Sequence, residues 1–371
     1  MREIEKKASQ AYGERFDEDP ELVASAPGRI NLIGEHTDYN GGFVLPCAVD
    51  RRVAVAAARG GGELYSTNFD EMRRLDEARD GSWADYPRGV AWALDEKGYE
   101  AGNLRAVYAG DVPLASGLSS SAAIEAATAL ALDVLFGSGL DRKELAVLCQ
   151  RAENEYVGVQ SGIMDQYASL LCEAGSALLV DCRSLEAESV PLNLEEANLA
   201  LLVCDTRVER GLADTGYNDR RASCERAAAT LGVEQLRDAG VEDVSRLSGE
   251  ELIRARHIVT ENARVLDAVA ALQTGDFPEL GRLMYASHAS MRDDFEISTK
   301  ELDAFVEIAE ADGAPGARLT GAGFGGCAIA LVETDKTGRL ARAVRETFEA
   351  RSFKDPVFYE FVPAAGAEVT R

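Results

Sequence analysis

A short run of small residues, DVPLASGLSSSAA at positions 111–123, constrains the fold of this chain most strongly. The apolar run at 104–109 before it predicts a buried strand, and the helical spacing at 120–135 after it predicts a helix. Backbone N–H groups in the first turn of a helix have no intrahelical partner and lie at the positive end of the helix dipole, so such a loop binds phosphate well. No acidic residue stands between Gly117 and Ile124, although the chain has 64 of them, which leaves this helix start free for an anion.

The same serines also fit a second interpretation, in which they simply cap the helix. The loop lacks the lysine of the P-loop pattern GxxxxGK[ST], because Leu118 and Ser119 follow Gly117, and it does not match G-x-G-x-x-G. A P-loop is therefore excluded, and a dinucleotide-binding fold is disfavoured. A second glycine-rich run, GARLTGAGFGG at 316–326, predicts tight turns or close backbone approach, and phosphate contact and simple packing both stay open for it.

Strands and helices alternate along the rest of the chain without the regular repeat of parallel βαβ units, which predicts an α+β fold. Further strands are expected at 52–59, 176–182, 199–205, 327–333 and 357–362. Further helices are expected at 83–96, 142–156, 163–171, 217–231, 250–273, 280–293, 300–311 and 337–351. A chain of 371 residues suits two domains, and the acidic segment 184–196 is the predicted boundary, giving domains 1–190 and 191–371.

The net charge of −25 disfavours two classes of partner. A strongly acidic surface repels nucleic acid and anionic lipid, so we expect no nucleic-acid or membrane binding, and an anionic ligand needs a site with local positive charge. The sequence shows no apolar run long enough to span a bilayer and no secretory leader. The seven cysteines are scattered and odd in number, as expected for the reduced thiols of a cytoplasmic protein.

The segment PGRINLIGEHTDYNGGFVLP at 27–46 concentrates polar chemistry near the N-terminus. Its charged and polar residues include Arg29, Glu35, His36, Asp38 and Asn40. The glycines around them suggest a loop outside the core, in which these groups could hydrogen-bond several hydroxyls of a polyol at once. A metal site is the competing interpretation, but the possible ligands lie too close along the chain to complete a coordination sphere alone. Polyol binding is therefore favoured over a metal site and over a solvated loop.

This segment resembles the signature of galactokinases, which belong to the GHMP kinase superfamily. The serine loop at 113–123 is similar to the ATP-phosphate motif of that family, and 319–326 is similar to its third, glycine-rich motif. Three shorter stretches add to the resemblance: GIMDQ at 162–166, ENAR at 261–264 and SHASMRD at 287–293. The run EHTDY at 35–39 is the most specific, because it separates galactokinases from mevalonate and homoserine kinases.

The resemblance implies a two-domain GHMP kinase fold with the active site in the cleft between the domains. It also implies a reaction in which ATP phosphorylates α-D-galactose at O1, giving α-D-galactose 1-phosphate and ADP, the first committed step of galactose use by the Leloir pathway. Asp165 would face the anomeric hydroxyl, either as a general base or as an electrostatic and orienting group. Arg29 would keep Asp165 ionised and stabilise phosphoryl charge.

The other site residues that the resemblance implies fall into three groups. For galactose they are Glu35, His36, Asp38, Gly162 and Tyr217. For ATP they are Gly117, Leu118, Ser119, Ser120, Ser121 and Ala122. For Mg²⁺ they are Ser120 and Glu153, a set of oxygen ligands suited to a hard cation. Trp83 and Tyr86 fall where the family has an aromatic segment near adenine, although packing explains them equally well.

Two alternatives stay open from the sequence. One is a related GHMP kinase that acts on N-acetylgalactosamine, arabinose, galacturonate or another small molecule. The other is a sugar- and ATP-binding regulator that has lost catalysis, which the intact serines 119–121 and Asp165 disfavour. We therefore expect a monomeric, cytoplasmic enzyme whose ligands are galactose and Mg·ATP.

Overall fold

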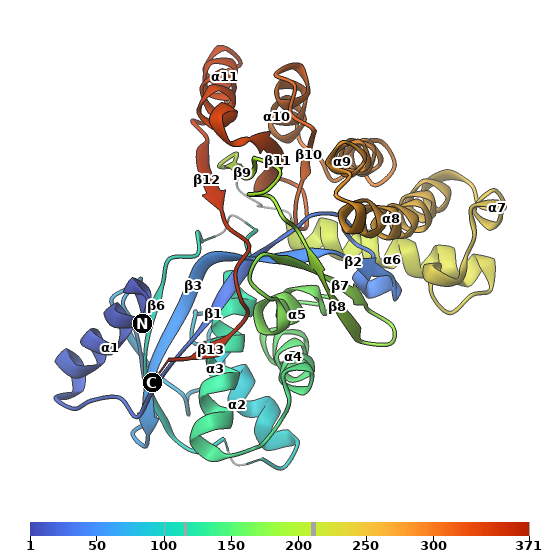
Figure 1. Ribbon diagram of the computed structural model, residues 1–371. Coiled ribbons are helices and arrows are strands. Elements are labelled where there is room, and N and C mark those ends of the chain that lie inside the picture. Colours follow the sequence, from blue (N-terminus) through green and yellow to red (C-terminus); the bar gives the residue numbers. More distant parts are fainter. Residues whose placement is uncertain (100, 115–116, 209–212, 371) are drawn as a thin grey trace.

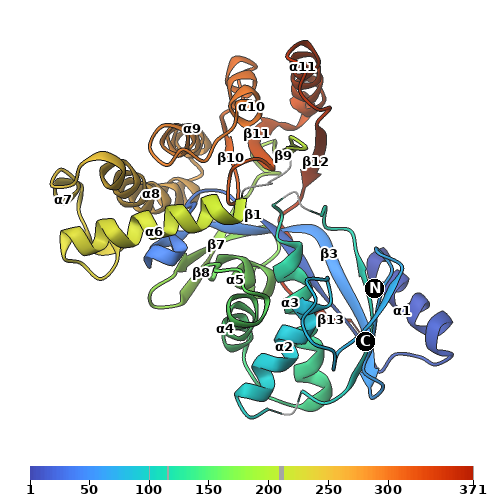
Figure 2. The same ribbon diagram turned by 180° about the vertical axis from the view of Figure 1, so that it is seen from behind.

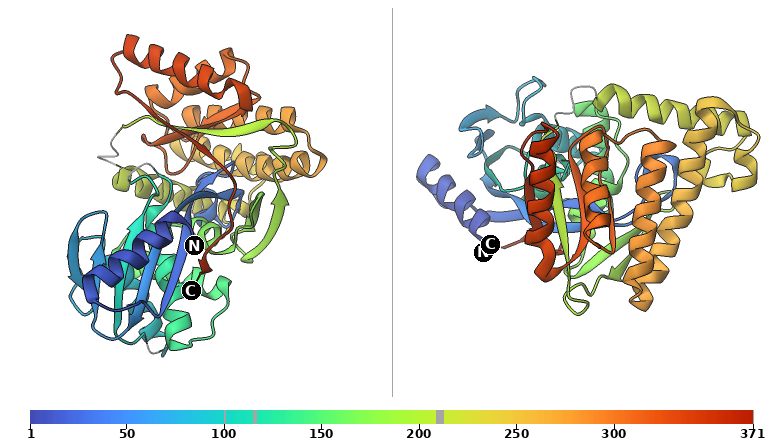
Figure 3. Two further views of the ribbon diagram at one scale, coloured as in Figure 1. Left: turned by 60° about the vertical axis from the view of Figure 1, so that its left-hand side comes forward. Right: turned by 90° about the horizontal axis from the view of Figure 1, so that it is seen from above.

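The computed structural model describes residues 1–99, 101–114, 117–208 and 213–370. They form two lobes, and in Figure 3 the C-terminal helices and strands lie over the N-terminal sheet. The two chain ends lie side by side on the N-terminal lobe (Figure 1), because a short final strand returns to pair with the first one.

The N-terminal lobe is built on a six-stranded sheet with the strand order β13-β1-β3-β6-β4-β5. Its strands are β1 (Leu22–Asn31), β3 (Pro46–Arg59), β4 (Glu63–Ser66), β5 (Glu71–Arg74), β6 (Leu104–Gly110) and β13 (Glu368–Val369). One face is covered by α1 (Glu3–Phe16), and the other side carries α2 (Asp85–Glu96), α3 (Ser120–Phe136), α4 (Arg142–Arg151) and α5 (Met164–Leu171), as Figures 1 and 2 show. Both faces of β3 are therefore apolar, since Ala54 and Ala56 belong to the core under α1 while Val53 and Val55 belong to the core under α3. This accounts for the continuous apolar run that predicts a strand at 52–59.

A three-stranded antiparallel sheet with the order β2-β7-β8 extends this lobe. Its strands are β2 (Phe43–Val44), β7 (Ser176–Asp181) and β8 (Glu186–Pro191). The acidic segment 184–196, which the sequence predicts to be a domain boundary, thus contains a strand that pairs with β7 along its whole length. The division at 190/191 stays a prediction, and β13 crosses back over it to pair with β1.

The C-terminal lobe centres on a four-stranded antiparallel sheet with the order β10-β11-β9-β12. Its strands are β9 (Leu199–Asp205), β10 (Gly316–Leu319), β11 (Cys327–Glu333) and β12 (Val357–Phe361). Its helices are α6 (Ala213–Leu231), α7 (Val241–Val244), α8 (Gly249–Thr274), α9 (Phe277–Asp293), α10 (Lys300–Ala311) and α11 (Thr337–Ala350). The fully buried rings of Phe295, Phe305 and Phe348 lie in the core that these elements share.

The helices and strands expected from periodicity are present with ends shifted by a few residues, whereas the expectation of a loop outside the core at 27–46 is wrong. Its first residues belong to β1, which is buried at every position, and Glu35 and His36 are 1% and 5% exposed. These polar groups tolerate burial because they find partners in the C-terminal lobe, as described below. The helix expected at 142–156 ends at Arg151 and continues as one turn of π-helix, η2 (Ala152–Val157). Within the described residues, no helix combines the length and the apolar character needed to cross a membrane.

Candidate active site

A cavity of about 520 Å³ lies between the two lobes. The N-terminal lobe contributes β1 and the starts of α3 and α5, and the C-terminal lobe contributes α6 and the turn after β10. The predicted site residues that line it are Arg29, Glu35, His36, Asp38, Gly117, Leu118, Ser119, Ser120, Ser121, Glu153, Gly162, Asp165 and Tyr217. Ala122 is the exception, because its side chain is fully buried inside the first turn of α3. The fold therefore gathers motifs from both halves of the chain in one place.

An ion pair joins Arg29 and Asp165 in this cavity. Nε and Nη2 of Arg29 donate to the two carboxylate oxygens of Asp165, each at 2.7 Å. Nη1 of the same guanidinium donates to the carbonyl oxygen of Gly117 at 2.6 Å. The Arg29 side chain is 6% exposed, whereas 23% of the Asp165 side chain remains exposed. The carboxylate is thus held in a fixed orientation by a buried bidentate partner and keeps access to the cavity.

Ser119 stands immediately before α3 and has a left-handed backbone conformation, with φ 57° and ψ 52°. Its side chain makes no capping bond to the helix, and its hydroxyl donates instead to Asp165. The first turn of α3 contains no acidic residue. The capping interpretation is therefore wrong for Ser119. The N–H groups of the first turn are not capped by the Ser119 hydroxyl, and the turn has no carboxylate of its own.

A close backbone contact between β1 and the serine loop holds this loop directly against the strand. The backbone N–H of Arg29 donates to the carbonyl oxygen of Leu118 at 3.0 Å. A Cβ atom on Gly28 would lie 2.5 Å from that same oxygen, which no real contact allows. Glycine at position 28 is therefore what lets the loop rest on the strand.

His36 and Tyr217 form an aromatic wall of the cavity, with their ring centroids 5.1 Å apart. Nδ1 of His36 lies 2.8 Å from the hydroxyl of Tyr39, and Nε2 lies 3.1 Å from the carbonyl oxygen of Ala322. A carbonyl can only accept, so Nε2 carries the proton and Nδ1 accepts from Tyr39. Burial lowers the pKa of His36 to about 3, and the ring is therefore neutral.

Asp38 is a partly buried carboxyl group whose pKa is raised to about 6, first by loss of contact with solvent and then by the nearby charge of Asp165. It accepts a hydrogen bond from the backbone N–H of Tyr39 at 2.9 Å. Gly162 packs directly against it, and a Cβ atom there would lie 1.8 Å from Oδ2 of Asp38. Glycine at 162 therefore leaves room for the Asp38 carboxylate beside the start of α5.

Glu35 lines the cavity and also ties it to the C-terminal lobe. Arg318 of β10 pairs with Oε2 of Glu35, and the backbone N–H of Gly321 donates to Oε1 at 2.9 Å. The Arg318 side chain is completely buried. Sequence reasoning missed this arginine, and the one signal for it was a charged residue in an apolar strand just before a glycine-rich run. Glu35 thus connects the first and the third motif of the family.

A second buried carboxylate, Glu261 in α8, supports the same turn from behind. Its Oε1 accepts from the backbone N–H of Gly34 at 3.0 Å and from Oγ of Ser287 at 2.5 Å, and Arg264 pairs with its Oε2 at 2.6 Å. The stretches ENAR at 261–264 and SHASMRD at 287–293 are described in full, and neither contributes a residue to the cavity lining. They act by positioning the sugar motif.

Glu153 lies in η2, the π-helical turn after α4, and is 5% exposed. Its Oε2 accepts from Oγ of Ser161 at 2.5 Å and from Nε2 of Gln166 at 2.9 Å. Burial raises the pKa of Glu153, and the hydrogen bond from Ser161 opposes this effect. Gln166 also donates to Glu125 at 3.2 Å, and burial raises the pKa of that carboxyl well above its usual range. Single π-helical turns are frequent at functional sites.

Ser120, Ser121 and Glu153 offer the oxygen donors of a magnesium site. All three line the same cavity, which brings two hydroxyls and a carboxylate together beside the helix start. Mg²⁺ usually takes one or two protein carboxylates and completes its shell with substrate phosphates and water. Within the described ranges, no three His, Cys, Asp or Glu side chains group closely enough to hold a metal by themselves. These donors therefore fit a cation that binds together with a phosphate.

A second cavity of about 300 Å³ adjoins the first, and the two share Tyr86, Ser120 and Ser121 in their linings. Trp83 also lines this second cavity, together with apolar side chains from the sheet and α3. Its ring lies edge-on to that of Tyr108, with the centroids 5.5 Å apart. Trp83 thus packs against the core and at the same time faces an apolar cavity next to the helix start.

Three segments of this chain match the models of known protein families. They are the galactokinase galactose-binding signature at 10–59, the GHMP kinases N terminal domain at 85–173 and the GHMP kinases C terminal at 268–350. The fold resembles that of Methanococcus jannaschii mevalonate kinase with a TM-score of 0.66, over 92% of this chain and 98% of that one, and at 20% identity this likeness shows the fold alone. The fold and the serine-loop site together define a GHMP kinase.

Two further proteins are more similar. The galactokinase of Streptomyces coelicolor is 48% identical over 374 residues, which cover 96% of this chain and 97% of the relative. The crystal structure of Lactococcus lactis galactokinase complexed with galactose has a TM-score of 0.92 at 35% identity, and covers 97% of this chain and 98% of that one. The chain belongs to the galactokinase family. This confirms the predicted family, the two-domain α+β fold and the predicted function of an ATP-dependent sugar kinase.

Proposed function

We propose that this chain transfers the γ-phosphoryl group of ATP to O1 of α-D-galactose in the cavity between the lobes. The observation that carries this proposal is the cluster of Arg29, Ser119 and Asp165. Residues of the sugar motif and the first turn of α3 line the same cavity as this cluster. A sugar hydroxyl and a phosphate bound to these two elements would therefore meet beside the Asp165 carboxylate.

Asp165 is the group that we place at the anomeric hydroxyl. Its carboxylate can accept the O1 proton as the bond from O1 to the γ-phosphorus forms and the bond from that phosphorus to the bridging oxygen of ADP breaks. Arg29 binds both carboxylate oxygens, which fixes the orientation of the carboxylate. The transition state of phosphoryl transfer is loose, so this positioning contributes to the rate in addition to proton removal.

Galactose recognition is assigned to Glu35, His36, Asp38, Tyr217 and the backbone of Gly162. All five line the cavity, and Glu35, Asp38 and Tyr217 carry polar side chains that could pair with a sugar hydroxyl. Both ring nitrogens of His36 are bonded to Tyr39 and Ala322, so His36 would contact the sugar with the face or edge of its ring. An epimer with one hydroxyl misplaced would leave one of these buried groups unpaired, which is a strong source of discrimination.

The phosphates of ATP are assigned to the first turn of α3, with adenine in the 300 Å³ cavity against Trp83 and Tyr86. Mg²⁺ would be held by Ser120 and Glu153, where it would neutralise charge on the phosphates. The shared lining of the two cavities at Ser120 supports a single nucleotide that reaches from one cavity into the other.

A monomeric, cytoplasmic enzyme completes the proposal. No disulfide joins any of the seven cysteines, and all but Cys182 are buried, which suits a reducing compartment. Light scattering on the purified protein would test the monomer, and a folded fragment of residues 1–190 would test the domain division.

The proposed substrate is tested by measuring ADP release with Mg·ATP and a panel of sugars. The panel comprises galactose, N-acetylgalactosamine, arabinose, galacturonate and glucose, with mevalonate as a substrate of the wider superfamily. Turnover confined to galactose is expected. Turnover on another sugar would contradict the assignment of the pocket, and silence on every substrate would contradict catalysis.

A further inference from the structure

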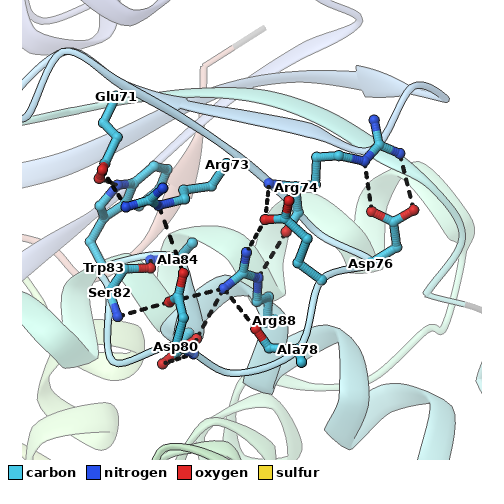
Figure 4. A network of polar contacts seen from close by, with 12 residues as sticks. Glu71, Arg73, Arg74, Asp76, Ala78, Asp80, Ser82, Trp83, Ala84 and Arg88 are labelled. Carbon is cyan, nitrogen blue, oxygen red and sulfur yellow. Dashed lines mark hydrogen bonds and ion pairs between the residues drawn. The ribbon is translucent and has the colours of Figure 1, made fainter.

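A buried arginine organises the segment between β5 and α2, which forms one edge of the 300 Å³ cavity. Arg88 is only 1% exposed, and its guanidinium contacts Asp85 at 3.1 Å and Glu77 at 2.7 Å. It also contacts Asp80 at 3.2 Å (Figure 4). Its Nε also donates to the carbonyl oxygen of Arg74 at 2.8 Å. The segment is therefore pinned to α2 by one charge with several partners, and it is not a free surface loop.

Two arginines at the end of β5, Arg73 and Arg74, and one in the segment, Arg79, differ in how their charge is used. Arg73 pairs with Glu71, and Arg74 pairs with Asp76 at 2.8 Å (Figure 4). Arg79 makes no hydrogen bond or ion pair with any residue in the described part of the chain. Its charge is therefore available to a ligand.

Arg79 lies where the two cavities meet. It lines the 300 Å³ cavity together with Val157. Its two terminal nitrogens lie 3.2 Å from the position that a Cβ atom on Gly158 would occupy, and Gly158 lines the 520 Å³ cavity. The guanidinium therefore stands beside the path that a nucleotide would follow from one cavity to the other.

The charge of the cavity lining indicates what Arg79 could bind. A polyanionic nucleotide must bind to a chain of net charge −25. Among the described residues that line the two cavities, Arg29 and Arg79 are the arginines and no lysine is present. Arg29 is already neutralised by its bidentate pair with Asp165. Arg79 is thus the one lining cation whose charge is not cancelled by a carboxylate.

We propose that Arg79 binds the phosphate chain of the nucleotide and that the Arg88 network holds it in position to do so. The proposal rests on the placement of ATP described under Proposed function. A guanidinium suits this task because its planar donors match phosphate oxygens in pairs. Arg79 would then lower the KM for ATP without taking part in the chemistry at Asp165.

The test is the binding of ATP and of adenosine to Arg79→Gln, measured by calorimetry, together with steady-state kinetics. Arg79 is exposed, so the Kd for ATP should rise about 5-fold, near the upper end of the range for ion pairs in contact with solvent. Adenosine carries no phosphate, so its Kd should stay within about twofold, as should kcat at saturating ATP and the KM for galactose. Arg79→Lys should recover part of the loss. Arg74→Gln is the matched control, because Arg74 lies at the end of β5 just before the segment, pairs with Asp76 and lines neither cavity.

Several results would overturn the proposal. If Arg79→Gln bound ATP with the same Kd as wild type, Arg79 would have no role in phosphate binding. If the Kd for adenosine rose as much as the Kd for ATP, Arg79 would contact the base or the ribose instead of the phosphates. An equal rise in the Kd for ATP in Arg74→Gln would mean that the effect comes from the net charge of the protein and not from a contact made by Arg79. Trp83 fluorescence, measured in a Trp92→Phe background, tests the placement of adenine independently of the role of Arg79. Adenosine that leaves Trp83 emission unchanged would contradict the adenine cavity itself, whereas a response to adenosine with no effect of Arg79→Gln on ATP would contradict only Arg79.

Discussion

Replacing Gly162 by alanine is expected to damage galactose binding through Asp38. The new Cβ atom would lie 1.8 Å from Oδ2 and 2.2 Å from Cγ of Asp38, whereas real contacts stay above 3.0 Å. The carboxylate must therefore retreat by about 1.2 Å from Gly162, which takes it out of hydrogen-bonding range of a sugar hydroxyl. The loss of one hydrogen bond to a charged group costs about 1.5–3 kcal/mol, so the KM for galactose should rise about 10- to 150-fold. The Arg29–Asp165 pair is untouched, and kcat should fall much less.

The assay is ADP release at saturating Mg·ATP over a range of galactose concentrations. Gly338→Ala in α11 is the matched control, because the nearest atom to its new Cβ is the flexible end of Arg342 at 4.0 Å. The double variant Gly162→Ala/Asp38→Ala tests the route, since it should bind galactose about as weakly as Asp38→Ala alone. A KM for galactose within about twofold of wild type, in a Gly162→Ala protein of normal melting temperature, would refute the reasoning.

Two further predictions concern buried charges. Burial and Asp165 raise the pKa of Asp38 to about 6, so Asp38 is increasingly protonated below that pH. Galactose affinity measured by calorimetry should weaken as the pH falls through 6 in wild type but not in Asp38→Asn, and an equal slope in both would contradict the role. Arg318→Met leaves the Glu35 carboxylate buried without its partner and should lower the free energy of unfolding in urea by about 3–5 kcal/mol. Arg339→Met, at an exposed ion pair, is the control, and an equal loss there would count against the argument.

The serine loop and α3 could be predicted from the sequence because their signal is local. A strand, a run of small residues and a helix follow one another within a few dozen positions, and the absence of acids after Gly117 can be read directly. The structure bears out a helix that begins at Ser120 with no acid in its first turn. The hydrogen bond of Ser119 to Asp165 could not be predicted. A serine hydroxyl at a helix start can also cap the helix, and Asp165 becomes its partner only because α5 packs beside this loop.

The burial of the sugar motif could not be predicted for a different reason. Glu35 is stabilised by Arg318, and Gly34 by Glu261, partners more than two hundred residues further along the chain. A single sequence carries no sign of which distant charges will meet, so a polar stretch with glycines reads as a loop. Likewise, β13 is too short to show any periodicity, and only its pairing with β1 reveals it.

The most direct test of the central claim is the kcat of Asp165→Asn with galactose and Mg·ATP. Asparagine keeps an oxygen for Arg29 to bind but cannot accept the O1 proton or carry the charge. We expect kcat to fall by about 10²–10⁴, the usual contribution of a positioned acid–base group, while galactose affinity and the circular dichroism spectrum stay near wild type. A kcat close to that of wild type in a natively folded variant would contradict the role of Asp165.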